Sequence, residues 1–255
     1  MKKILYKFYK IVFRNRLITP VLDIKPANFL RYGRFYNDYL TYKKMPGAEK
    51  LSVRALFPIL DEKTNKTNID PHYFYQGIWA ADKIIKSKAQ EHTDVGSQVN
   101  LIGFLTTITK IRFVDIRPLS VDLPNLENIK GDILHLPFGN NSVSSLSCLH
   151  VAEHIGLGRY GDQLNPLGTK RACAELSRVL GHGGNLYFSL PIGKQQVYFN
   201  AHRIHLPQTI LNYFNGLKLV EFSAVDDKGN YIRNADLKNF ENASYSCGLF
   251  HFIKP

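Results

Sequence analysis

The sequence is poor in the residues that build disulfide frameworks and membrane spans. Its 255 residues include three cysteines, Cys148, Cys173 and Cys247, too few and too scattered for a disulfide framework or a zinc ribbon. No run of about 18 uncharged apolar residues occurs, which excludes an ordinary transmembrane helix. The first residues lack a small-residue cleavage site and make a poor signal peptide. We therefore expect a cytoplasmic protein in a reducing compartment.

Acidic residues are also scarce, and the imbalance is local. The chain has 21 Asp and Glu against 33 Lys and Arg, a formal net charge of +12. Residues 1–50 hold 12 of the basic and 3 of the acidic residues, so the remainder is nearly neutral. Such a charge fits nucleic acid, anionic lipid or anionic small molecules as partners. No nucleic-acid-binding signature is present, and we do not expect nucleic acid as a partner.

The basic N-terminal region, residues 1–70, is predicted to be an extension of the main domain. Apolar residues recur at helical spacing over residues 4–12 among lysines, which predicts a basic amphipathic helix. Its apolar stripe can pack on the body of the protein, or it can lie on an anionic membrane at the inner face. Residues 20–66 are punctuated by proline and glycine, which favours irregular structure packed around the core.

From residue 71 to 255 the pattern predicts alternating helices and strands. Expected helices are 73–88, 101–109, 170–180, closed by Gly181–Gly184, and 208–214. Expected strands are 92–96, 111–116, 129–134, 143–149, 185–190, 217–225 and 246–253. This alternation indicates a parallel sheet covered on both faces, with ligands beyond the carboxyl ends of the strands.

An ordered set of short motifs runs from about residue 92 to 254. The motifs are Asp94-Val95-Gly96-Ser97, Val114-Asp115-Ile116-Arg117-Pro118, Gly131-Asp132-Ile133-Leu134-His135-Leu136-Pro137-Phe138, Glu153-His154-Ile155 and the segment Leu180 to Pro191. Together they resemble class I S-adenosylmethionine-dependent methyltransferases. The resemblance implies an α/β, Rossmann-like, mostly parallel sheet with an antiparallel last strand. The first two motifs combined with the run from Glu153 to Asp162 are similar to an uncharacterised methyltransferase-like family, a domain of unknown function, which implies a link to surface-polysaccharide or glycan synthesis.

The resemblance implies a cofactor site for S-adenosylmethionine at Asp94, Gly96, Asp115, Asp132 and Leu134. Asp115 follows Asp94 by 21 residues, where an acid can accept hydrogen bonds from ribose hydroxyls. Gly96 allows close backbone approach, and Asp132 or its neighbouring amide can read the adenine edge. Each aspartate could instead be an ordinary loop or cap residue.

The chain departs from the family directly after Gly96. Residues 97–100 are Ser-Gln-Val-Asn where the family usually has further glycines. Two hypotheses therefore stand. The first is a methyltransferase acting on a sugar, glycan or glycolipid precursor. The second is a non-catalytic scaffold within a surface-glycan assembly complex.

Histidines follow the fourth and fifth predicted strands. His154 and His202 are the predicted catalytic residues, because a histidine base titrates near neutral pH. Four further residues, His150, Glu153, Arg159 and His205, are predicted to contact the substrate. Hydrogen-bonded scaffold roles are the alternative for the histidines, and a salt-bridged turn is the alternative for Arg159. The histidine spacings could suit a divalent metal, but no metal-binding signature such as HExxH is present, so no metal site is predicted.

Overall fold

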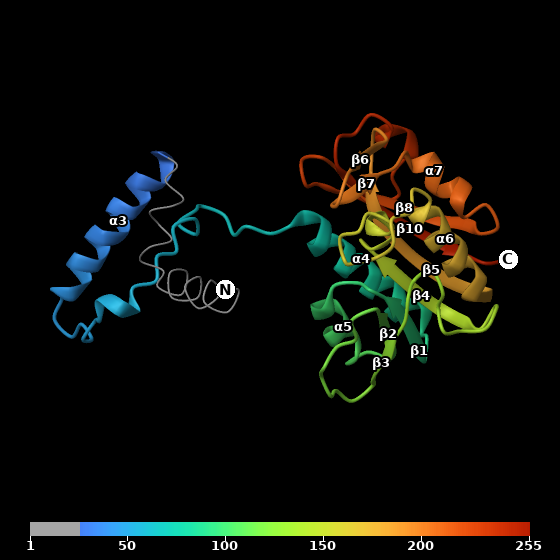
Figure 1. Ribbon diagram of the computed structural model, residues 1–255, viewed down its shortest axis with the longest axis horizontal. Coiled ribbons are helices and arrows are strands. Elements are labelled where there is room, and N and C mark those ends of the chain that lie inside the picture. The colour runs from blue at the N-terminus through green and yellow to red at the C-terminus, as the bar shows by residue number, and fades with distance from the viewer. Residues whose placement is uncertain (1–25) are drawn as a thin grey trace, which may run out of the picture. The chain divides into compact units, whose positions relative to one another are not determined.

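The structure is a computed structural model that describes residues 26–255. The chain divides into two compact units, a first that ends at Ile69 and a second, Asp70–Pro255; Figure 1 shows both. The amphipathic helix predicted over residues 4–12 lies outside the described residues. Within residues 26–255, no helix is long and apolar enough to cross a membrane.

The first unit contains a long helix where the sequence predicted irregular structure. Helix α3 spans Pro26–Lys43, and a 3-10 turn, η1, spans Val53–Ala55. The prediction of irregular structure is therefore wrong over α3. Proline in the first turn is compatible with a helix, because its missing N–H would have no partner there. A single internal glycine, Gly33, costs only about 1 kcal/mol.

The second unit is built on an eight-stranded sheet with the order β3-β2-β1-β4-β5-β10-β8-β9. Its strands are β1 (Glu91–Val95), β2 (Lys110–Asp115), β3 (Leu126–Lys130), β4 (Val143–Leu149), β5 (Leu180–Ile192), β8 (Lys218–Val225), β9 (Tyr231–Ile232) and β10 (Ser246–Ile253). The five strands β3, β2, β1, β4 and β5 are parallel, and β10 is antiparallel to both β5 and β8. The predicted α/β sheet, mostly parallel with an antiparallel last strand, is confirmed.

Helices cover both faces of this sheet. The helices are α4 (Pro71–Ser87), α5 (Val99–Leu105), α6 (Gly168–Val179) and α7 (Pro207–Tyr213). In one hydrophobic core, α6 and α7 pack against the face of the sheet that contains Phe188 of β5 and Phe250 of β10. In the other, α4 and α5 pack against the face that contains Tyr187 of β5 and Leu249 of β10. Adjacent strand residues thus enter opposite cores, as the two-residue period of a strand requires. Figure 1 shows the two pairs of helices on opposite sides of the sheet.

Several segments differ from the predicted elements. Helix α6 passes directly into β5, so Gly181 to Gly184 belong to the strand. Gly181 is needed there because a Cβ would lie 2.9 Å from the carbonyl oxygen of Asn141. Strand β3 ends at Lys130, which leaves Asp132 in the following turn. A small hairpin of β6 (Gln196–Tyr198) and β7 (His202–Ile204) was not predicted.

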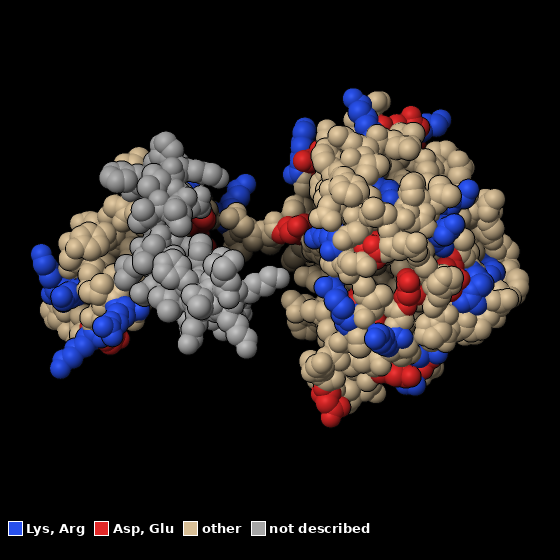
Figure 2. Space-filling model, in the orientation of Figure 1, with Lys and Arg blue, Asp and Glu red and all other residues tan. Residues whose placement is uncertain are grey.

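Charge is evenly distributed on the visible face of the second unit. Figure 2 shows Lys and Arg interspersed with Asp and Glu over that face. This agrees with the nearly neutral composition of residues 51–255, which hold 21 basic and 18 acidic residues. The basic excess of the chain is therefore concentrated in its first fifth.

Candidate functional site

A pocket of about 560 Å³ lies at the carboxyl ends of the parallel strands. It is lined by residues that end or follow β1 to β4, because these ends meet at one edge of the sheet. Six of the predicted site residues line it: Gly96, Asp115, Asp132, Leu134, His150 and His154. The other five, Asp94, Glu153, Arg159, His202 and His205, are not part of its wall.

Gly96 forms a narrow part of the wall. Its φ of +70° is in the left-handed region that favours glycine. A Cβ at this position would lie 3.1 Å from Cγ1 of Val151 and 3.7 Å from Oδ2 of Asp115. The pocket therefore has a surface of bare backbone at this turn, which a side chain would fill.

Residues 97–100, which stand where the methyltransferases that the sequence resembles usually have further glycines, do not enter the pocket. Ser97 is buried, and its Oγ accepts a hydrogen bond from the Leu149 N–H at 3.0 Å. Gln98 and Asn100 are exposed, and neither lines the pocket. The departure from the family pattern therefore leaves the pocket open.

Asp94 supports the Gly96 turn from within the sheet. It is fully buried, its Oδ1 accepts a hydrogen bond from the Ser97 N–H at 3.0 Å, and its Oδ2 accepts one from Ser147 Oγ. Burial raises the pKa of Asp94 to about 6. Ser147 also lies 2.8 Å from Nε2 of His92, whose pKa burial lowers to about 3. Asp94 thus positions the turn and does not line the pocket.

Asp115 and Asp132 present carboxylate oxygens at the pocket. Oδ1 of Asp115 accepts a hydrogen bond from the Arg117 N–H at 2.7 Å, while Oδ2 has no hydrogen-bond partner among residues 26–255. Oδ1 of Asp132 accepts from the Leu134 N–H at 2.9 Å. The Leu134 amide is therefore already occupied, and the free carboxylate oxygens are the better candidates for contacts with a ligand.

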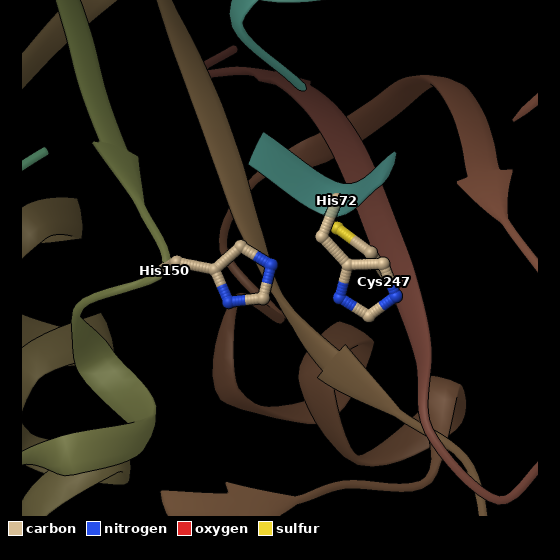
Figure 3. A group of neighbouring side chains, drawn as sticks. All are labelled: His72, His150 and Cys247. Atoms are coloured by element: carbon tan, nitrogen blue, oxygen red, sulfur yellow. The ribbon is translucent and has the colours of Figure 1, made fainter. Parts of the chain in front are cut away.

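His150 occupies the sharp turn after β4. It lies beside His72 and Cys247, which the sequence did not single out. Its φ of +55° is uncommon for a residue with a side chain and is typical of functional sites. Its ring lies 5.4 Å from that of His72. Figure 3 shows His72, His150 and Cys247 together. Burial and the charge on His150 lower the pKa of His72 to about 4.

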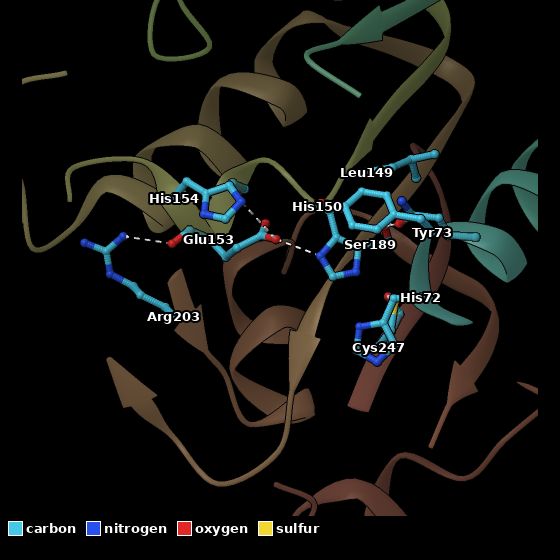
Figure 4. Close-up of polar contacts among 12 residues, drawn as sticks. His72, Tyr73, Leu149, His150, Glu153, His154, Ser189, Arg203 and Cys247 are labelled. Atoms are coloured by element: carbon cyan, nitrogen blue, oxygen red, sulfur yellow. Dashed lines mark hydrogen bonds and ion pairs between the residues drawn. The ribbon is translucent and has the colours of Figure 1, made fainter. Parts of the chain in front are cut away.

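A buried carboxylate connects His150 to His154. Both lie around η2 (Ala152–His154), and Figure 4 shows Glu153 between the two rings. Oε1 of Glu153 lies 2.8 Å from Nδ1 of His150 and 3.7 Å from Nε2 of His154. Burial alone would raise the pKa of Glu153. The charge and hydrogen bond of His150, followed by the charge of His154, have the larger effect, so the pKa of Glu153 is lowered. Burial likewise opposes a charge on His150, but Cys247 and Glu153 raise its pKa to about 10.

His154 has a defined orientation at the pocket. Its Nδ1 lies 2.5 Å from the carbonyl oxygen of Ala201, which can only accept, so Nδ1 carries a proton. Nε2 then carries the lone pair of the ring and lies 3.7 Å from Oε1 of Glu153. The ring also meets the edge of Tyr160 at 5.8 Å.

The two histidines of the β7 region are separated from the pocket wall. The His202 ring packs between Tyr198 and Tyr245, each at 5.0 Å, and burial lowers the pKa of His202. His205 is buried against Tyr213, and burial lowers its pKa to about 4. Neither ring reaches the pocket that contains His154.

Arg203, which the sequence did not single out, holds the rim of the pocket. It is 6% exposed, and its guanidinium donates hydrogen bonds to the carbonyl oxygens of Ile155 at 2.5 Å and Asn165 at 3.0 Å. Both of these residues line the pocket. Burial lowers the pKa of Arg203.

The predicted substrate-binding Arg159 lies outside the pocket wall and packs on an aromatic ring. Its guanidinium carbon is 5.2 Å from the centre of the Tyr160 ring, and that of Arg117 is 4.8 Å away. No ion pair joins Arg159 to a carboxylate within residues 26–255. Tyr160 and Arg117 line the pocket, so a cationic and aromatic rim borders the site.

The sequence contained one usable signal for Cys247 and none for His72. An antiparallel last strand begins at the edge where the parallel strands end, so its first residues reach the pocket edge. Cys247 is the second residue of β10 and pairs with Pro191 of β5. His72 is placed by the N-terminus of α4, where Asp70 accepts hydrogen bonds from the His72 and Tyr73 N–H groups. That placement depends on how α4 packs on the sheet.

One family model matches part of this region. It is described as "Caenorhabditis protein of unknown function, DUF268" and matches residues 136–247, less than half of the chain. None of the curated proteins matches the chain at a significant level.

Solved structures share the fold of the chain at low sequence identity. The [4+2]-cyclase SpnF is 13% identical, with a TM-score of 0.54, and the match covers 71% of this chain and 81% of that one. The N-methyltransferase NodS from Bradyrhizobium japonicum WM9, in complex with S-adenosyl-L-homocysteine, is 12% identical with a TM-score of 0.53, covering 74% and 90%. These likenesses show a Rossmann-like methyltransferase fold.

Proposed function

We propose that the pocket binds S-adenosylmethionine and that the protein methylates a hydroxyl of a sugar, glycan or glycolipid precursor. The observation that carries this proposal is the open pocket in which the bare Gly96 turn faces the free Oδ2 of Asp115. When bound, the cofactor would supply an electrophilic methyl group. Gly96, Asp115 and Asp132 would hold it, and the Leu134 side chain would contribute to the wall.

The open pocket supports a cofactor-binding role over a non-catalytic scaffold role. A scaffold without a ligand would fill the space after β1 with side chains, but Gln98 and Asn100 are exposed and outside the pocket wall. The similar NodS structure was solved with S-adenosyl-L-homocysteine, which supports a related ligand here. The similar SpnF is described as a cyclase, so the fold alone does not determine the reaction.

His154 is the residue best placed to accept the proton of the acceptor hydroxyl. It lines the pocket, and the Ala201 carbonyl oxygen holds the proton on Nδ1, which leaves the lone pair of the ring on Nε2. After Nε2 accepts a proton, the positive ring lies 3.7 Å from the buried Glu153 carboxylate, which stabilises it. His202, the other predicted catalytic residue, is not in the pocket wall and has no comparable support.

The acceptor class and the cellular location are proposals that rest on the sequence and on the pocket rim. Arg117 and Tyr160 at the rim suit an anionic or sugar-containing acceptor. The basic first fifty residues support peripheral contact with the inner face of an anionic membrane. Three free, buried cysteines support a cytoplasmic location.

A methyl-transfer assay tests the proposed function. The protein is incubated with S-adenosylmethionine labelled in the methyl group and with glycan and glycolipid fractions. We expect label in an acceptor, with a rate reduced by about 10²–10⁴-fold in His154→Ala and unchanged cofactor affinity. His182→Ala, on an exposed histidine outside the pocket, is the matched control. Absence of transfer to every fraction, with bound cofactor demonstrated, would contradict methyl transfer to glycans.

A further inference from the structure

Three potential metal ligands from distant parts of the chain converge beside the pocket. His72 is in the first turn of α4, His150 follows β4, and Cys247 is near the start of β10. One ligand atom from each lies within 4.8 Å of the other two. Figure 3 shows the two rings side by side, with the cysteine sulfur next to them.

The orientation of His150 leaves one nitrogen directed at this cluster. Glu153 Oε1 lies 2.8 Å from Nδ1 of His150 and fixes the ring. Nε2 of His150 is buried and has no hydrogen-bond partner, in a residue that is only 8% exposed. A carboxylate on the far nitrogen is the usual partner of a metal-binding histidine, because it orients the ring and increases its basicity.

We propose that His72, Nε2 of His150 and Sγ of Cys247 bind a divalent transition metal of the zinc type, with Glu153 as the outer carboxylate. Imidazole nitrogen and thiolate sulfur are ligands that zinc prefers. Three protein ligands leave a fourth position for water or another oxygen ligand, as in catalytic zinc sites. This proposal is independent of the proposed methyl transfer.

The dimensions of the cluster suit a small tetrahedral site. Zinc bonds of about 2.0 Å to nitrogen and 2.3 Å to sulfur place tetrahedral ligand atoms roughly 3.5 Å apart. Since the three atoms are already within 4.8 Å, binding would draw them together by about 1.3 Å at most, a movement that side-chain torsions can provide. A metal of this type binds thiolate and neutral imidazole, so its binding competes with protons and weakens at low pH.

The surroundings favour a metal over a simple polar cluster. Besides its place within 4.8 Å of the two histidine nitrogens, Sγ of Cys247 makes only a weak hydrogen bond to the neighbouring Gly248 carbonyl oxygen, at 3.8 Å. A buried nitrogen without a partner, such as Nε2 of His150, is unfavourable. A bound metal would satisfy both atoms. Because His150 also lines the pocket, the metal would lie at the pocket wall.

The site is distinct from the histidine spacings considered in the sequence. Nδ1 of His154 is bound to the Ala201 carbonyl oxygen, and the His202 ring packs against aromatic rings. The proposed site therefore joins His150 to residues 78 positions before and 97 positions after it in the chain, and neither His154 nor His202 is among its ligands.

Cobalt substitution of the full chain tests the site directly. Purified protein is stripped with a chelator, titrated with Co²⁺ and followed by absorption. We expect one equivalent to bind, with a thiolate-to-cobalt charge-transfer band and the intense visible bands of four-coordinate cobalt. Zn²⁺ should displace the Co²⁺ and raise the melting temperature of the stripped protein.

Variants assign the ligands. Cys247→Ser should abolish the charge-transfer band, His72→Ala or His150→Ala should abolish stoichiometric binding, and Glu153→Gln should weaken binding by about 10–100-fold. Cys173→Ser, a buried cysteine of α6 in the other core, is the matched control and should retain the band.

Two results would overturn the proposal. One is wild-type protein without stoichiometric binding or without a charge-transfer band. The other is a band that persists in Cys247→Ser.

If Cys247→Ser does not fold by circular dichroism, a variant with Cys148 and Cys173 both replaced by alanine leaves Cys247 as the sole thiol. Loss of the band in that folded variant would equally refute the assignment. Absence of methyl transfer with an intact cobalt spectrum would affect only the proposed function.

Discussion

Replacing the buried Asp94 by asparagine should change how the stability of the protein depends on pH. Asparagine keeps an acceptor for the Ser97 N–H and a similar shape, but it has no charge to bury. Burial raises the pKa of Asp94 to about 6, against about 3.9 in an unfolded chain. The folded protein therefore binds the Asp94 proton more tightly than the unfolded chain does.

The sign and size of the effect follow from this difference. The stabilising contribution of the raised pKa is fully present below pH 4 and is lost as the pH rises through about 6. About two pKa units correspond to about 3 kcal/mol. Asp94→Asn should therefore gain about 3 kcal/mol of unfolding free energy relative to the wild type between pH 4 and pH 7.

Urea unfolding of both proteins at intervals across this pH range gives the difference in unfolding free energy. His92, with a pKa lowered to about 3, and His205, lowered to about 4, destabilise both proteins at acid pH, so their effects largely cancel in the difference. Parallel stability curves for the two proteins would refute the assignment of a raised pKa to Asp94.

Three further predictions concern the pocket wall, its rim and the N-terminal segment. Gly96→Val should reduce affinity for S-adenosylhomocysteine by at least about tenfold in calorimetry, because the left-handed backbone and the crowded Cβ site disfavour a side chain; Gly103→Ala, where a Cβ meets nothing within 4 Å, should not. Arg203→Met should lower the unfolding free energy by about 1–3 kcal/mol in urea titrations, because it leaves partly buried carbonyl oxygens of the pocket rim without a donor; an unchanged midpoint would exclude the role of Arg203 in holding the rim. Deletion of residues 1–18 should abolish salt-sensitive flotation with anionic vesicles, whereas flotation that persists would place the membrane contact elsewhere.

The sheet could be predicted from the sequence because its strands combine apolar patterns with clear turn signals. The predicted bounds of β4 and β10 agree with the structure. The residues after the parallel strands could be placed at one edge, which is why Gly96, Asp115 and His150 were predicted together. The sequence does not predict helix α3, because Pro26 and Gly33 are residues typical of breaks, although both are compatible with a helix at their positions.

The remaining parts of the site depend on packing that local patterns do not specify. Asp94 was expected at the cofactor, but its side chain faces Ser147 of the neighbouring strand inside the sheet. His72 and Cys247 meet His150 only because α4 and β10 are placed beside β4 and β5. The role of Arg203 depends on the β6–β7 hairpin, which is too short to have a distinct pattern.

Calorimetry of cofactor binding tests the central claim most directly. The wild-type protein is titrated with S-adenosylmethionine and S-adenosylhomocysteine beside Asp115→Asn and the control Asp122→Asn, whose exposed aspartate lies outside the pocket wall. We predict binding by the wild type and by the control, with a loss of about 1–3 kcal/mol in Asp115→Asn. No binding to the wild type up to millimolar ligand, or equal affinity in Asp115→Asn, would contradict a cofactor site at this pocket.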